Sequence, residues 1–195
     1  MQVLHGNGSR IKRVKRAEMP AQSQTIEEIN VSDSLRLTLN GDTFLIRDCV
    51  IGNDQILLFA IQANIQRLSR AQFWLIDGTF KTVPTVFRQL YTIYASVDTE
   101  NSRILLLIYS LVTSKSEEIY KSLFEKLIDF AAENDLTLQP SIILTDFELA
   151  LIKASRHIFF NVENKGCFFH LGQSGWRKFN HADLLLGMVM MSNLV

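Results

Sequence analysis

The chain begins with a polar, irregular stretch and then changes to regular patterns of apolar and polar residues. Residues 1–30 contain glycines, a proline and several Gln and Ser residues, and we expect them to form a flexible arm. In 35–49, apolar and polar residues alternate on both sides of Asn40-Gly41. This pattern predicts a β-hairpin, because Asn-Gly favours the tight turn between antiparallel strands. Residues 53–70 predict a short strand followed by a helix.

Short apolar runs predict further strands. Buried strands are expected at 72–77 and at 141–146, where four or five large apolar or β-branched residues precede an aspartate. The runs 87–97 and 103–112 are rich in β-branched and aromatic residues, and the polar segment between them predicts an antiparallel hairpin. One more short strand is expected at 166–170.

A helix is expected at 116–134, because apolar residues recur there with helical spacing. Ser114 and Glu117 have the spacing of a capping box. Glu117 and Lys121, and Lys121 and Glu125, are ion pairs at the favourable i,i+4 spacing. The apolar face of this helix consists of Ile119, Leu123, Leu127 and Ala131.

Two more helices are expected, at 147–157 and at 173–179. From residue 72 onward the predicted elements follow the order β-β-β-α-β-α-β, which indicates an α/β protein with a mixed sheet and helices against it. The predicted organisation is a basic arm (1–30), a hairpin and helix extension (31–70), a core (71–180) and an apolar helical tail (181–195).

The composition favours a globular protein. Hydrophobic residues make up 47% of the 195 positions and include 13 phenylalanines, which is enough for a core and fits one domain with an appendage. Two cysteines are too few for a disulfide framework. The sequence shows neither an apolar run of membrane-spanning length nor a secretory signal, so we expect a soluble intracellular protein.

The net charge is zero, but the charge is unevenly distributed. Five of the seven residues in 10–16 are basic, and without them 15 basic residues face 20 acidic ones. A body with a charge of about −5 does not bind nucleic acid through bulk charge, so such binding needs local patches, a metal or the arm. The arm itself is a solvated linker, a nuclear address or a phosphate contact.

Asp77 and Asp146 each end a short apolar strand. If the two strands are neighbours in the sheet, both carboxylates emerge at the same edge. Two carboxylates about 5 Å apart repel by roughly 3 kcal/mol at an effective dielectric near 20, which favours a shared proton or a cation between them. Oxygen ligands near a phosphate substrate suit Mg²⁺ or Mn²⁺, and two such ions promote phosphodiester cleavage.

Each aspartate also has a simpler interpretation. Thr145 and Glu148 fit a capping box, so Asp146 can serve only to favour a helix N-terminus. Asp77-Gly78 can be an ordinary turn. The segment around Asp77 also resembles the Asp-x-Asp-Gly-Thr motif of haloacid-dehalogenase-type hydrolases, but position 75, where their nucleophile would stand, is a leucine.

With these residues in place, the chain resembles the transposases of Mutator-like elements, the MULE domain, from about Thr25 to Phe179. The resemblance implies an RNase H-like fold, a DDE-type site with Mg²⁺ or Mn²⁺, transposon-end DNA as the partner and the nucleus as the location. The first two acids of that family match Asp77 and Asp146. The resemblance includes the segments LRLTLNGDTFLIRD, ILLFAIQANIQRLSRAQFWLIDGTFKTVPTVFRQLYTIYAS, LLIYSLVTSKSEEIYKSLFEKL, ILTDFELALIKA and GCFFHLGQSGWRK.

Further positions are candidates for binding. The family carries a Cys-x-x-His that matches Cys167 and His170, but a structural zinc needs about four ligands, so a buried cysteine and a hydrogen-bonded histidine near the site are favoured over zinc. Candidate DNA contacts are Lys81, Arg177 and Lys178, although an amphipathic helix with a solvated basic side is the favoured interpretation of the last two.

The sequence departs from the family in its last part. The third acid of the family is a glutamate downstream of the Cys-x-x-His, whereas Asp183 is the only acid after His170. We therefore expect a fragment or degraded copy that no longer catalyses strand cleavage or transfer at a useful rate. The alternative is a non-catalytic, transposon-derived module that binds DNA or protein. The apolar segment 184–195 is expected to promote self-association.

Overall fold

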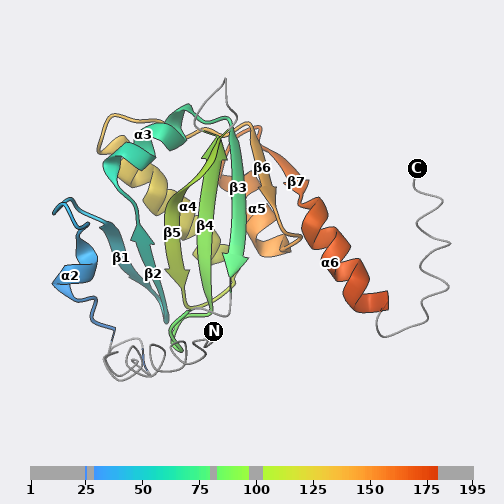
Figure 1. Cartoon of the computed structure of the whole chain (residues 1–195), viewed down its shortest axis with the longest axis horizontal. Helices are drawn as coiled ribbons and strands as arrows, with labels where there is room; N and C mark the ends of the chain where they lie inside the picture. The colour runs from blue at the N-terminus through green and yellow to red at the C-terminus, as the bar shows by residue number, and fades with distance from the viewer. Residues whose placement is uncertain (1–24, 26–28, 80–82, 97–102, 180–195) are drawn as a thin grey trace, which may run out of the picture.

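The computed structural model describes residues 25, 29–79, 83–96 and 103–179 of the chain (Figure 1). Most of the basic arm, with its basic residues at 10–16, Lys81 and the apolar tail at 184–195 lie outside the described residues. No helix within the described ranges is both long enough and apolar enough to cross a bilayer. In chain order the elements are α2 (Asp33–Arg36), β1 (Leu45–Ile51), β2 (Asp54–Phe59), α3 (Gln62–Arg70), β3 (Phe73–Thr79), β4 (Gln89–Ser96), β5 (Ile104–Val112), α4 (Glu117–Ala132), β6 (Ile142–Thr145), α5 (Leu149–Ile158), β7 (Glu163–Gly166) and α6 (Phe168–Phe179).

All seven strands belong to one mixed sheet, in the order β1-β2-β5-β4-β3-β6-β7. The first five strands of that order pair antiparallel, and β6 joins β3 and β7 joins β6 in parallel. A parallel neighbour needs a crossover connection, and α4 and α5 supply the two crossovers. The expected α/β class with a mixed sheet is confirmed.

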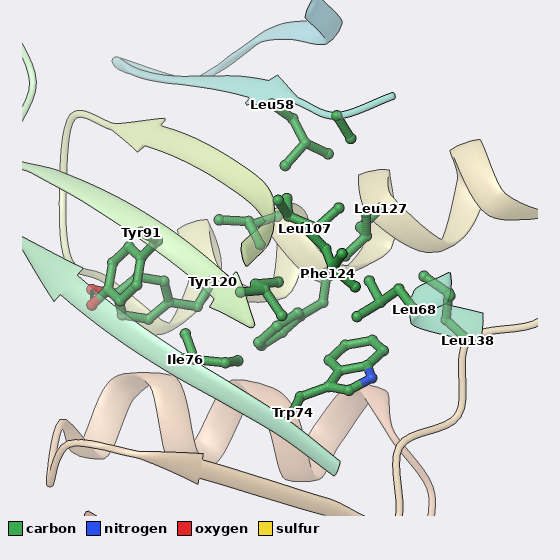
Figure 2. Close-up of a cluster of buried hydrophobic side chains, with 14 of the residues drawn as sticks. Leu58, Leu68, Trp74, Ile76, Tyr91, Leu107, Tyr120, Phe124, Leu127 and Leu138 are labelled. Carbon is green, nitrogen blue, oxygen red and sulfur yellow. Dashed lines mark hydrogen bonds between the residues drawn. The ribbon is translucent and has the colours of Figure 1, made fainter. Parts of the chain in front are cut away.

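One face of the sheet is packed against α4 and α5, which lie behind the strands in Figure 1. Strand β3 directs Trp74 and Ile76 to this face because side chains alternate along a strand. Figure 2 shows both side chains in the core beside Phe124 of α4. Edge-on ring contacts of Phe159 with Trp74 (5.3 Å) and Phe124 (5.2 Å) connect the sheet to both helices.

The opposite face carries a smaller apolar cluster near β1, β2 and the segment before β4. Its buried members are Val31, Leu45, Leu57 and Phe87. Asp77, which alternates with Trp74 and Ile76, faces this side of the sheet. The core side chains of β3 and the candidate carboxylate therefore lie on opposite faces of the same strand.

The hairpin expected at 35–49 is only partly formed. The turn is confirmed: Gly41 has φ +87°, its N–H donates to the carbonyl of Thr38 at 3.0 Å, and Leu37 bridges to Thr43. The first arm is wrong, because Asp33–Arg36 form the short helix α2. The second arm continues into β1, which pairs with β2 instead of folding back on the first arm.

The expected start of the long helix also needs correction. Ser116, not Ser114, caps α4, and its hydroxyl accepts from the N–H of Ile119 at 3.2 Å. Ser114 instead donates to Asp54 at 2.9 Å. Lys121 pairs with Glu117 at 2.7 Å rather than with Glu125.

The strand expected at 166–170 is wrong. Strand β7 covers the polar residues Glu163–Gly166, and Phe168–His170 already belong to α6. Backbone pairing with β6, up to Thr145 opposite Gly166, forms this strand without an apolar side-chain pattern. The sequence therefore gave no periodic signal for it.

Candidate functional site

One candidate aspartate, Asp77, lies in β3, and the other, Asp146, directly follows the neighbouring parallel strand β6. The register of β3 and β6 pairs Phe73 with Ile142 and Leu75 with Leu144. Extending this register by two residues brings Asp77 level with Asp146, which directly follows β6. Adjacent strands lie about 4.8 Å apart, so this register would bring the two residues side by side, two residues before β3 ends and one residue after β6 ends.

The Asp77 carboxylate is accessible, with 37% of its side chain exposed. Its Oδ1 lies 3.4 Å from Nε2 of His170, which α6 brings to this edge. The next residue, Gly78, faces the core, and a Cβ added there would lie 1.5 Å from the buried amide nitrogen of Gln89. The absence of a side chain at Gly78 therefore leaves room for the side chain of Gln89 against β3. Asp77-Gly78 belongs to β3 and is not a turn.

Asp146 is fixed by the chain that follows it. Its Oδ1 accepts from the backbone N–H of Glu148 at 3.2 Å and contacts the hydroxyl of Thr145 at 3.3 Å. The first of these bonds is an Asx-turn. The capping box of Thr145 and Glu148 is not formed, because the Glu148 side chain makes no capping bond and points elsewhere.

That side chain enters a cluster that the sequence analysis missed. The hydroxyl of Tyr91 donates to Oε2 of Glu148 at 2.6 Å, and the hydroxyl of Tyr120 donates to Oε1 at 2.5 Å. Lys115 Nζ lies 3.1 Å from Oε2. We call these four residues the Glu148 cluster. Both tyrosines are buried, and Figure 2 shows their hydroxyl oxygens side by side.

The environment of the Glu148 cluster favours neutral tyrosines. Burial, followed by the hydrogen bond to Glu148, raises the pKa of Tyr91 and of Tyr120 far above the ordinary value of 10.0. Each hydroxyl therefore keeps its proton and remains a donor. The only sequence signal for this contact was the position of Tyr120 beside the apolar face of α4, which does not identify its partner.

Cys167 and His170 lie close to the aspartates but form no zinc centre. The N–H of Cys167 donates to the carbonyl of Thr145 at 2.8 Å, and His170 turns its Nε2 to Asp77. Within the described ranges, no three His, Cys, Asp or Glu residues are grouped so that they could hold a metal ion. A four-ligand zinc site is therefore absent from the described part of the chain.

A pocket of about 720 Å³ opens beside this edge of the sheet, lined by 83–88, Thr113 and Lys115. Arg88 in its wall is exposed, so the pocket has a basic side. Arg177 and Lys178 lie in the last turn of α6, after the exposed Trp176.

The chain was compared with curated proteins and with models of protein families. No curated protein matches the chain. The family model of the MULE transposase domain matches residues 73–174, from β3 into α6. The match covers more than half of the chain and includes Asp77, Asp146 and His170. The chain belongs to the MULE transposase domain family.

Proposed function

We propose that this domain is built for metal-dependent cleavage and transfer of DNA strands, with Asp77 and Asp146 as the metal ligands. The observation that carries the proposal is the parallel pairing of β3 with β6, because its register, extended by two residues, would bring Asp77 level with Asp146. An RNase H-like fold is part of the proposal, and it is supported by the order of β3 to β7 with α4 and α5, which follows the expected β-β-β-α-β-α-β.

The residues at this edge fit Mg²⁺ or Mn²⁺. Mg²⁺ is commonly held by one or two carboxylates and completes its shell with water and substrate phosphate. The Asp77 carboxylate is half exposed and has only a long contact to His170, so it has acceptor capacity left. Asp146 uses Oδ1 within its own turn, which leaves Oδ2 for a cation.

Bound divalent ions would supply Lewis-acid activation of the attacking oxygen and stabilisation of the leaving oxygen. In this proposal the chain holds these ions through Asp77 and Asp146. The imidazole of His170 orients the Asp77 carboxylate through Nε2. Arg88, which is exposed at the neighbouring pocket, offsets the negative charge of the body and attracts a DNA phosphate. A DNA substrate places the protein, in our proposal, in the nucleus.

We further propose that the chain is a weak catalyst by itself. The described residues include no group of three His, Cys, Asp or Glu side chains that could hold a metal ion, and the nearby Glu148 is bound by the tyrosines of its own cluster. A binding role for DNA or protein is the second candidate. It is favoured by large apolar side chains exposed on α6, namely Phe168, Phe169 and Trp176.

Calorimetric titration with Mn²⁺ tests the proposal on the whole chain, on Asp77→Asn and on Asp146→Asn. We expect binding that both substitutions abolish, because each removes half of the carboxylate pair. Asp129→Asn is the matched control, since Asp129 is an exposed acid on α4 paired only with Lys126. Nicking of supercoiled plasmid measures catalysis in the same samples. A folded chain that binds no Mn²⁺ contradicts the metal site, and efficient nicking contradicts the weak catalysis.

A further inference from the structure

We propose that Glu148 is a positioning residue: the hydroxyls of Tyr91 and Tyr120 anchor its carboxylate, and its backbone N–H in turn orients Asp146 for a metal ion. This inference rests on the proposed function, because it concerns the same metal site. It assigns a role to residues outside the pair of acids.

The anchor of Glu148 is rigid. Each carboxylate oxygen receives one tyrosine hydroxyl, at 2.6 Å and 2.5 Å, and Lys115 adds a charge-assisted contact. Tyr91 comes from the centre of the sheet and Tyr120 from the first turns of α4. Their rings meet edge to face at 5.0 Å, and both side chains are buried. The carboxylate is therefore held by two elements of the core.

The anchor is linked to Asp146 through two residues of backbone. Glu148 is the residue before α5, and its N–H donates to Oδ1 of Asp146. Because the Glu148 side chain is fixed at one end, the turn 146–148 has little freedom to move its N–H. This fixed donor limits the rotation of the Asp146 carboxylate by holding Oδ1, so that in our proposal Oδ2 is the oxygen that binds the cation.

Glu148 itself is unsuited to be the third metal ligand in this arrangement. A ligand needs free oxygen lone pairs directed at the cation, whereas both of its oxygens accept from buried tyrosines. Its side chain is 15% exposed, compared with 37% for Asp77. The role that fits these contacts is an anchor outside the ligand set, as is common around metal sites.

The experiment tests whether the position of the Glu148 carboxylate, and not only its charge, affects metal binding. The double variant Tyr91→Phe/Tyr120→Phe removes both hydroxyls but keeps the rings and the charge of Glu148. Glu148→Asp keeps the charge in a side chain too short for the same contacts. Asp54→Asn is the matched control, because Asp54 also accepts two hydroxyls, from Thr113 and Ser114, but has no bond to Asp146.

We expect the Mn²⁺ dissociation constant to rise about tenfold or more in the double variant and in Glu148→Asp, which is the usual effect of losing an outer partner. It should change less than twofold in Asp54→Asn. Circular dichroism at the titration temperature verifies that each variant is folded. If the double variant disrupts the fold, the single Tyr120→Phe replaces it, with an expected rise of severalfold.

Hydrogen exchange of the Glu148 amide gives a readout without metal. The amide should exchange faster in the Tyr91→Phe/Tyr120→Phe variant, and its exchange rate should be unchanged in Asp54→Asn. Unchanged exchange, or Mn²⁺ affinity within twofold of the original chain, overturns the positioning role. If the original chain binds no Mn²⁺, the proposed function fails, and faster exchange in the double variant still supports the anchor.

Discussion

The two faces of strand β3 have different roles. On one face, Trp74 and Ile76 are almost fully buried against α4 and α5. On the other face, the Asp77 side chain is 37% exposed, and its carboxylate lies 3.4 Å from the imidazole of His170. The strand geometry is the same, so the difference lies in what covers each side.

The helix-covered face of β3 mainly stabilises the fold, whereas the accessible face carries the candidate metal ligand. Apolar area removed from water on the helix-covered face stabilises the fold, by roughly 25 cal/mol for each Å². The accessible face contributes less to folding, so it tolerates a charge that the core would reject. Substitutions on the two faces should therefore affect different measurements.

The largest expected effect is on the covered face. Phe124→Ala should lower the free energy of unfolding by about 3–5 kcal/mol, because it removes a fully buried ring and leaves a cavity beside the ring of Phe159. Urea denaturation followed by circular dichroism measures the loss. Phe168→Ala is the control, since Phe168 is 84% exposed, and it should change stability by less than about 0.5 kcal/mol.

A smaller loss of stability is expected at Gly78, which follows Asp77 in β3 but faces the core. Gly78→Ala places a Cβ against the fully buried Gln89 and should cost about 1–3 kcal/mol of unfolding free energy. Gln89→Ala in the same chain should recover part of this loss, because it removes the atoms in conflict. Gly172→Ala on α6, where nothing lies within 4 Å, should show no such penalty. Full additivity of the first two substitutions would contradict the clash.

The third prediction concerns alkaline pH. The pKa of Tyr91 and of Tyr120 is raised in the folded protein, whereas the unfolded tyrosines ionise near 10.0. Above that pH the unfolded state loses protons that the folded state keeps, so stability present below pH 10 decreases as the pH rises. Each tyrosine adds a slope of about 1.4 kcal/mol per pH unit.

Other charged groups, Lys115, Glu148 and Asp146, lie near the two hydroxyls and also affect how stability depends on pH. The measurement therefore compares the chain with a variant that lacks one hydroxyl. Thermal unfolding of the chain and of Tyr91→Phe between pH 8 and pH 11 should show a shallower decline in the variant. Parallel curves would mean that Tyr91 ionises normally in the folded state.

The smallest effect on stability is expected at the accessible face. Asp77→Asn should change the unfolding free energy by less than about 0.5 kcal/mol without metal, because the side chain is half exposed and has one long contact. The same variant should lose the rise in unfolding temperature that Mn²⁺ gives the original chain. A large loss of stability without metal would show that Asp77 is a structural residue.

Much of the fold could be predicted from the sequence, because its strongest elements carry local patterns. The apolar strands at Trp74 and Ile143 and the amphipathic helix of Phe124 were predicted near their observed bounds. Strand β7 was missed because its residues are polar and its formation depends on pairing with β6. Helix α2 was missed because a four-residue helix has no detectable period.

The candidate site was only partly predictable. Asp77 and Asp146 were found because each follows a short apolar run, although β3 continues past Asp77 to Thr79 and the parallel register of the two strands is not encoded locally. The anchor of Glu148 could not be predicted, since Tyr91, Tyr120 and Glu148 are far apart in the sequence. Each of these residues also fits a common local pattern, of a strand, a helix or a helix start, and such patterns gave no reason to connect them.

The parallel pairing of β3 with β6 also determines when the two acids meet during folding. The register offset of 69 residues means that a long chain segment must close before Asp77 and Asp146 come together. Closing a loop of that length costs on the order of 4 kcal/mol of chain entropy. The β4–β5 hairpin and α4, which lie between them, have more local contacts and are expected to form earlier. A nascent or partly folded chain would then lack the proposed metal site, so the activity proposed for it would arise only as folding is completed.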